Sequence, residues 1–248
     1  MAVDFSLRAP CEVRRSIPEP KLLSMVRHHA LAEFAQQQYQ AAHPELDEKA
    51  IRERLTVQIQ VNMPDGLARE MPVKLANIFG MTKELDAWRG ACGPCRANVA
   101  DRPFGCIGKI NYPIAAESES WLLTRLPPDP QHPAVAQLFK FVADLNIDGL
   151  PVDKGRLNAK IFSLRRPPVR HWGEGAARRT LTSSQVLHML LFGGSIGAQQ
   201  AVLYTRLLNL DTVLKDPHPP SANIEQFKTF FCALVMAGRL NCTVDVNS

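Results

Sequence analysis

The order of the predicted elements constrains the fold of this chain more than any other feature of its sequence. Residues 20–40 carry a helical stripe of apolar side chains, whereas Thr56-Val-Gln-Ile-Gln-Val61 alternates strictly, as a half-buried strand does. From residue 182 onward the pattern is helical. Strands in the middle of a chain, without regular alternation with helices, predict the α+β class. We therefore expect a small central antiparallel or mixed sheet, N-terminal helices and an all-helical C-terminal part.

Local signals add further elements to this outline. Pro64-Asp-Gly66 predicts the turn of a hairpin after the first strand, and Thr182-Ser-Ser-Gln185 is a capping box that begins a helix. Further strands are predicted at residues 106–114 and 158–164. The glycines between residues 193 and 197 predict a hinge between two core helices.

The composition also indicates where domains divide. With 248 residues the chain is long enough for one large domain or two modest ones. Small residues thin the apolar pattern between positions 173 and 181. We predict an α+β domain over residues 1–172 and a helical subdomain over residues 173–248. One single domain over residues 1–248 is the alternative.

Half of the six cysteines lie within fifteen positions, at Cys92, Cys95 and Cys106. A Cys-x-x-Cys pair can turn both thiolates to one metal ion, and a tetrahedral site then needs two further ligands. Cys106 supplies a third, and His132 is the nearest downstream histidine for the fourth position. Thiolate-rich structural sites favour zinc, with an iron–sulfur cluster as the alternative. The fourth ligand could also be His43, Cys11, Cys232 or Cys242.

The tetrapeptide Cys92-Gly-Pro-Cys95 also resembles the active-site motif of the thioredoxin family, and Ile147-Asp-Gly-Leu-Pro-Val152 looks like that family's proline-bearing segment opposite the dithiol. The resemblance implies thiol–disulfide exchange in which Cys92 attacks and Cys95 resolves. In that chemistry the first thiol lies at a helix N-terminus, which lowers its pKa. Residues 84–91 indicate a polar helix end instead of the family's buried strand. A third interpretation is that these cysteines are small buried hydrophobes.

The chain is basic, with a formal net charge of +5 and a pI near 9.0. Such a charge favours acidic partners where it is concentrated. One segment concentrates it, and the anion-binding candidates there are Arg165, Arg166, Arg170, Trp172, Arg178 and Arg179. Arginine forks that bind phosphates beside an aromatic ring suit single-stranded nucleic acid. The alternative is a solvated loop.

Other features concern location and catalysis. The first residues lack the basic start and apolar core of a secretory signal, so the cysteines indicate reduced thiols in a cytoplasm. Glycines and polar residues interrupt the longest apolar stretch, Val186–Tyr204, so no membrane partner is expected. His28 and His29 point about 100° apart on a helix and cannot chelate one ion, so neither is assigned to a site.

These features predict a soluble, cytoplasmic zinc-binding protein that acts as an interaction module for a protein, a nucleic acid or another anionic partner. The alternative is a thiol–disulfide oxidoreductase or an iron–sulfur enzyme that uses Cys92 and Cys95. No His-Glu-x-x-His motif occurs in the sequence. Whether the protein is an enzyme therefore stays open.

Overall fold

The computed structural model describes residues 2–62, 68–143, 146–147, 150–151, 161–163, 166–175, 178–192, 194–213 and 221–247. The chain folds into two compact units. Unit 1 consists of Met1–Ala9, Arg96–Asp101 and Gly105–Ser248. Unit 2 consists of Pro10–Cys95 and Arg102–Phe104. The division near residues 173–181 that the sequence suggests stays a prediction.

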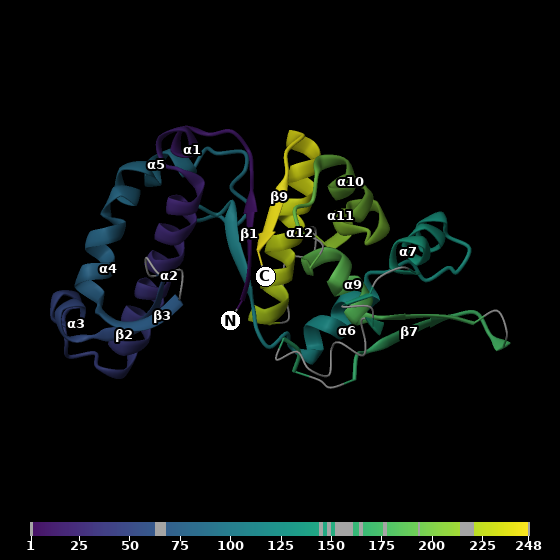
Figure 1. Cartoon of the computed structure of the whole chain (residues 1–248), viewed down its shortest axis with the longest axis horizontal. Helices are drawn as coiled ribbons and strands as arrows, with labels where there is room; N and C mark the ends of the chain where they lie inside the picture. The colour runs from purple at the N-terminus through teal and green to yellow at the C-terminus, as the bar shows by residue number, and fades with distance from the viewer. Residues whose placement is uncertain are drawn as a thin grey trace. The chain divides into compact units, whose positions relative to one another are not determined.

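Unit 2 is a set of helices with one hairpin (Figure 1). Its elements are α1 (Glu12–Ser16), α2 (Glu19–Ala42), α3 (Glu48–Arg54), β2 (Thr56–Asn62), β3 (Ala68–Lys74), α4 (Leu75–Thr82), the 3₁₀ helix η1 (Lys83–Trp88) and α5 (Arg89–Cys92). Both α3 and α4 contact the long helix α2, and the two strands pair antiparallel. The predicted hairpin is therefore confirmed, while its turn at residues 64–66 lies outside the described residues.

The core of unit 2 is shared among its elements, and α2 buries only Leu22, Met25 and Ala32. Pro20 lies in the first turn of this helix, where a missing N–H costs no hydrogen bond. At the start of α3 the Asp47 side chain accepts a hydrogen bond from the Ala50 N–H at 2.7 Å, which caps the helix. Residues from α2, α3, β2 and α4 then meet in one buried cluster, namely Ala32, Ile51, Ile59, Leu75 and Ile78.

Unit 1 is built on a three-stranded antiparallel sheet in the order β4 (Ile107–Asn111), β1 (Ala2–Leu7), β9 (Val244–Asn247). The buried helix α12 (Ala222–Leu240) packs against β1 and β4. The Phe5 and Phe230 rings meet edge to face with centroids 5.2 Å apart. A Cβ at Gly108 would lie 2.3 Å from the Phe5 ring, so only glycine fits that position of β4.

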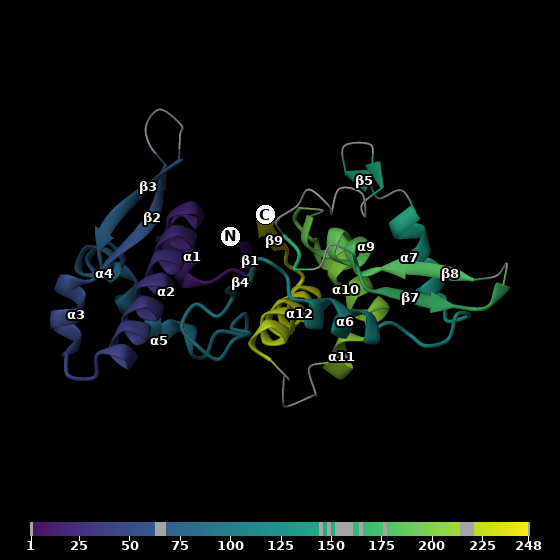
Figure 2. The same ribbon diagram turned by 90° about the horizontal axis from the view of Figure 1, so that it is seen from below.

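The remaining elements of unit 1 complete the fold. They are α6 (Ala116–Thr124), α7 (Pro133–Ala143), β5 (Asn146–Ile147), β6 (Leu150–Pro151), β7 (Val169–Trp172), β8 (Arg179–Thr182), α9 (Ser183–Leu187), the π-helical segment η4 (His188–Phe192), α10 (Ala198–Leu207) and α11 (Leu210–Val213). Figure 2 shows the β7–β8 ribbon beside α7, in agreement with the edge-to-face contact between Trp172 and Phe139.

The α+β class with small antiparallel sheets is confirmed. The capping box at Thr182 is present, with both of its reciprocal hydrogen bonds. The final strand β9 is an addition to the helical C-terminal part that the sequence indicates. Of the strand predicted at residues 158–164, only 161–163 are described, and Phe162 there forms an isolated bridge with Ile114. None of the described helices is long and apolar enough to cross a membrane.

Candidate functional site

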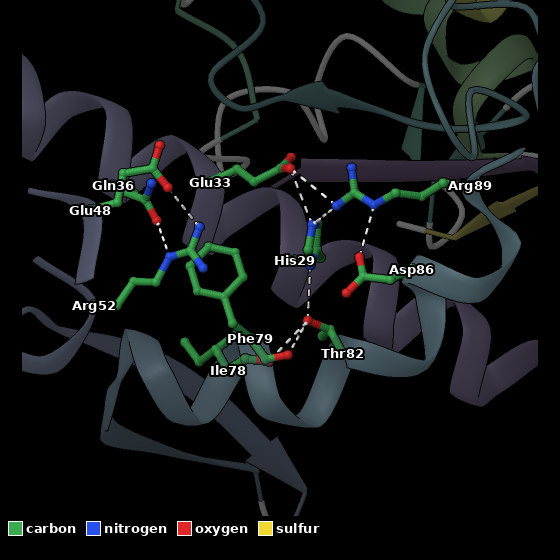
Figure 3. A network of polar contacts seen from close by, with 10 residues as sticks. All are labelled: His29, Glu33, Gln36, Glu48, Arg52, Ile78, Phe79, Thr82, Asp86 and Arg89. Carbon is green, nitrogen blue, oxygen red and sulfur yellow. Dashed lines mark hydrogen bonds and ion pairs between the residues drawn. The ribbon is translucent and has the colours of Figure 1, made fainter.

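A polar cavity of about 580 Å³ opens on one side of unit 2 (Figure 3). Five elements of this unit, α2, α3, α4, η1 and α5, supply its walls. The lining residues are His29, Glu33, Gln36, Gln37, Glu48, Arg52, Phe79, Gly80, Lys83, Asp86 and Arg89. We call this the unit 2 cavity. Its walls are mostly polar side chains that can donate, accept or carry charge.

His29 is held in the wall of this cavity by the hydroxyl of Thr82. The Thr82 hydroxyl donates to the Ile78 carbonyl at 3.0 Å, a common arrangement for a threonine within a helix. Its oxygen lies 2.9 Å from Nδ1 of His29, whose side chain is 13% exposed. Because the hydroxyl proton is already committed, Nδ1 is the donor in this contact and carries a proton. The second ring nitrogen, Nε2, is left for the cavity.

Nε2 of His29 lies between a carboxylate and a guanidinium (Figure 3). Oε1 of Glu33 is 3.1 Å from it, and Nη2 of Arg89 also contacts it. A neutral ring accepts a hydrogen bond from Arg89 but then points a lone pair at Glu33. A protonated ring donates to Glu33 but then faces the Arg89 cation. In neither protonation state are all three groups satisfied together.

The two arginines of the cavity are held by several weak contacts. Arg52 donates to Gln36 Oε1 at 2.8 Å and to Glu48 Oε2 at 3.0 Å, and its guanidinium lies 4.3 Å from the centre of the Phe79 ring. Arg89 donates to Asp86 at 3.0 Å. The side chains of Arg52 and Arg89 are 40% and 39% exposed. Exposed pairs of this kind contribute at most about 1 kcal/mol each, so a ligand can replace them.

Opposite charges are balanced around this cavity. Arg52, Lys83 and Arg89 face Glu33, Glu48 and Asp86 among the lining residues. Lys83 makes no ion pair with any acidic residue in the part of the chain that is described. The field inside is therefore polar without a strong net sign, which suits a ligand that itself carries both charges.

Cys92 lies in a different environment from the one that the thioredoxin-like motif implies. It is the last residue of α5, so it does not lie at a helix N-terminus, and that expectation is wrong. Burial raises the pKa of its thiol, and the neighbouring Cys95 and Cys11 thiols act in the same direction. A hydrogen bond from the Phe104 N–H to this thiol opposes them. Its surroundings therefore favour the protonated thiol over a thiolate.

The four predicted zinc ligands are divided between the units. Cys92 and Cys95 belong to unit 2, whereas Cys106 and His132 belong to unit 1. Cys106 directly precedes β4, as predicted, and Nδ1 of His132 accepts a hydrogen bond from the Ala134 N–H at 3.1 Å. Among the described residues, no group of three or more His, Cys, Asp or Glu side chains is arranged to hold a metal ion. The zinc site stays a prediction.

Two members of the basic segment make contacts that support the fold. Arg170 donates to the Leu123 carbonyl at 2.6 Å and to the Pro127 carbonyl at 3.3 Å. Trp172 is only 3% exposed, and its Nε1–H donates to the same Pro127 carbonyl at 3.0 Å. A buried indole has no free face for a nucleic-acid base.

The other arginines of the segment differ in their surroundings. Arg166 and Arg178 are exposed, and the guanidinium of Arg179 lies 5.5 Å from the centre of the Phe139 ring. Arg165 lies outside the described residues. Nucleic-acid binding by these arginines stays a prediction.

Sequence reasoning missed His29, because it considered only whether His28 and His29 could chelate a metal together. One signal is present, since Glu33 follows His29 by four residues and so lies on the same helix face. Thr82 and Arg89 are 53 and 60 residues from His29 along the chain. No local pattern links them to the histidine.

Comparisons with known proteins do not place this chain in a family. It matches no protein-family profile, no curated protein and no solved structure. Its function is therefore inferred from its own residues alone.

Proposed function

We propose that unit 2 binds a small amphoteric molecule, one with an acid group and an amino group, in the unit 2 cavity. Free amino acids are the simplest molecules of this class. The carrying observation is the unmet contact at His29, whose Nε2 faces Glu33 and Arg89 at once. A ligand that binds Arg89 leaves His29 and Glu33 to pair, and a ligand that binds Glu33 leaves His29 and Arg89 to pair.

The acid group of the ligand has two cations available to it. Arg89 shares its hydrogen bonds among Asp86, Glu33 and His29, and Lys83 also lines the cavity. A carboxylate can accept two parallel hydrogen bonds from a guanidinium, which is a stronger contact than a single one. Once Arg89 turns to the ligand, Nε2 of His29 no longer lies between two competing partners.

The amino group of the ligand is the reason for preferring an amphoteric molecule to a simple anion. A simple anion would meet the carboxylates of Glu33, Glu48 and Asp86 on the same walls, and these like charges would repel it. An ammonium group can instead donate to the carboxylates that the arginines release. The arginine and the carboxylate of each original ion pair then both have a partner in the bound ligand.

Calorimetric titration of the full chain with free amino acids tests this function. The matched probes are the N-acetyl derivatives, which lack the ammonium, and the amides, which lack the carboxylate. We expect each derivative to bind about tenfold more weakly than its parent amino acid, since each loses a charge-assisted hydrogen bond. Equal binding of parent and derivatives, or no binding of any amino acid, would contradict the proposal.

Variants of the chain locate the binding. Arg89→Gln should weaken amino-acid binding about tenfold, because the amide cannot replace the guanidinium fork. Arg54→Gln is the matched control, since this exposed arginine of α3 does not line the cavity.

A further inference from the structure

A second cavity, of about 420 Å³, lies in unit 1 and differs from the first in the charges of its walls. We call it the unit 1 cavity. It is formed where the end of α6 and the following proline-rich loop meet the end of α10. Its lining residues are Thr124, Arg125, Leu126, Pro127, Pro128, His132, Arg206 and Asn209. No acidic residue of the described chain is among them.

The two arginines of this cavity carry charge without a carboxylate partner in the described part of the chain. Arg125 is half-buried; its Nε donates to the Thr124 hydroxyl at 3.2 Å, and its guanidinium lies 5.3 Å from the centre of the Trp121 ring. These contacts leave the terminal amino groups of Arg125 for a ligand. Arg206 is exposed in the last turn of α10, where a cation also interacts favourably with the helix dipole.

His132 adds a donor whose direction is fixed by the backbone. Its Nδ1 accepts a hydrogen bond from the Ala134 N–H at 3.1 Å, at the start of α7. Nδ1 is therefore the acceptor nitrogen, and in the neutral ring the proton resides on Nε2. Nε2–H is a hydrogen-bond donor in either protonation state. The nearby Asp129 carboxylate accepts from the Gln131 N–H at 2.8 Å and is not part of the cavity lining.

The loop that forms one wall is held in place by the basic segment. Arg170 and Trp172 of β7 both donate to the Pro127 carbonyl, and Arg170 also donates to the Leu123 carbonyl. Burial lowers the pKa of the Arg170 guanidinium, as expected for a cation that is used inside the fold. These hydrogen bonds fix the chain on both sides of Arg125 before any ligand arrives, which reduces the ordering cost of binding.

We propose that the unit 1 cavity binds a phosphate group, with Arg125 and Arg206 as the charged contacts and His132 Nε2–H as a further donor. A tetrahedral oxyanion presents acceptor oxygens in several directions at once, and this cavity presents donors from three separate chain segments. A planar carboxylate would satisfy fewer of them. The group could belong to inorganic phosphate or to a phosphate monoester, because both offer the same oxygens.

Calorimetric titration of the full chain with inorganic phosphate and with glycerol phosphate tests this site. We expect saturable binding of at least one probe, at a constant ionic strength set with chloride. Arg125→Gln and Arg206→Gln should each weaken it about tenfold, since each removes a charge-assisted contact. Arg→Lys variants should lose less, because the charge is kept while the fork is lost. Lys109→Gln, which removes an exposed cation on β4, is the control that should bind normally.

Each outcome has a definite meaning. Tighter binding of glycerol phosphate identifies a phosphorylated organic molecule as the ligand, and equal binding identifies the phosphate group alone. Failure of both probes, or binding that Arg125→Gln and Arg206→Gln leave unchanged, overturns the proposal. Amino-acid binding in unit 2 is measured with other probes and variants, so the two proposals fail independently.

Discussion

The two cavities contain similar numbers of basic side chains but offer them to a ligand in different ways. In the unit 2 cavity, Arg52 and Arg89 already donate to carboxylates on the same walls. In the unit 1 cavity, Arg125 and Arg206 have no acidic neighbour among the described lining residues. A count of cations therefore does not predict which anions a cavity accepts. We expect the choice of anion to depend on whether each cation already forms an ion pair with a carboxylate before the ligand binds.

Because of this difference, we expect ligand affinity at the two sites to depend differently on salt concentration. A phosphate in the unit 1 cavity would be held mainly by Arg125 and Arg206, which have no carboxylate partner in the described part of the chain. Salt screens such charges over about 8–10 Å at physiological ionic strength. An amphoteric ligand in the unit 2 cavity exchanges existing ion pairs for new ones, so the total charge in contact with solvent changes little. Raising the chloride concentration should weaken phosphate binding more than amino-acid binding.

The largest effect is expected when a carboxylate is placed in the unit 1 cavity. Arg206→Glu exchanges a cation for an anion on a wall that has no acidic residue among its described lining. Phosphate affinity should fall about a hundredfold, because the variant both loses an attractive contact and gains a repulsive one. Calorimetric titration measures it, with Lys109→Glu as the control for the same change of charge elsewhere in unit 1. Retention of affinity in Arg206→Glu would show that the phosphate binds at another place.

The reverse change in unit 2 should give an intermediate effect. Glu33→Gln removes one carboxylate and leaves an amide that can donate to Nε2 of neutral His29, so the unmet contact disappears. N-acetyl amino acids should then bind about tenfold more tightly than to the unchanged protein, a gain of about 1.4 kcal/mol.

Glu53→Gln provides the control for this experiment. Glu53 is an exposed residue of α3 that does not line the cavity. Its substitution removes the same charge from unit 2 without touching His29. If Glu53→Gln raises the affinity for N-acetyl amino acids as much as Glu33→Gln does, only the overall charge matters and the role given to His29 is wrong.

The fold could be predicted from the sequence where its signals are local. The strand alternation at residues 56–61 and the capping box at Thr182 each depend on neighbours within a few residues, and both are confirmed. Strand β9 also alternates, as Val244-Asp-Val-Asn247, but it is only four residues long and pairs with β1 at the other end of the chain, with Phe5 opposite Val246. A short strand of this kind depends on its partner as much as on its own residues.

The candidate sites are less accessible to sequence reasoning for the same physical reason. The sequence predicts that His132 is a metal ligand. In the structure its ring is fixed by a hydrogen bond from the Ala134 N–H, and this contact depends on the start of α7. The sequence also predicts that Arg170 and Trp172 are surface groups, because their partners, the Leu123 and Pro127 carbonyls, lie more than forty residues away along the chain. Residue type indicates correctly that these groups are donors and cations. It does not indicate what they already contact.

A smaller effect is expected in the alkylation rates of Cys92 and Cys95, and it distinguishes burial of the thiols from metal binding. Because burial raises the pKa of the Cys92 thiol, less thiolate is present at neutral pH, and alkylation should be several-fold slower than at the more exposed Cys95. The sign for stability follows: the neutral thiol is favoured in the folded state, so its contribution is complete below the pKa of the unfolded thiol and is lost as the pH rises through the raised pKa.

A chelator distinguishes the two explanations for a slow Cys92. Alkylation followed by mass spectrometry should give the same rates with and without chelator if burial alone protects the thiol. Under the predicted zinc site, chelation should instead accelerate both Cys92 and Cys95, and elemental analysis should find near-stoichiometric zinc that Cys106→Ser removes. We expect the first result, because burial of Cys92 is by itself sufficient to slow its alkylation.

The smallest effect concerns two threonines that make the same helical hydrogen bond in different units. Thr82 donates to the Ile78 carbonyl at 3.0 Å and Thr229 donates to the Glu225 carbonyl at 3.0 Å, but only the Thr82 oxygen also accepts from His29. Thr82→Val should therefore lower the free energy of unfolding by about 1 kcal/mol more than Thr229→Val does, because it leaves Nδ1 of a largely buried imidazole without an acceptor. Urea denaturation of both variants measures the difference. Equal losses would mean that Thr82 does not fix the His29 tautomer, and the unmet contact at Nε2 would then lose its structural basis.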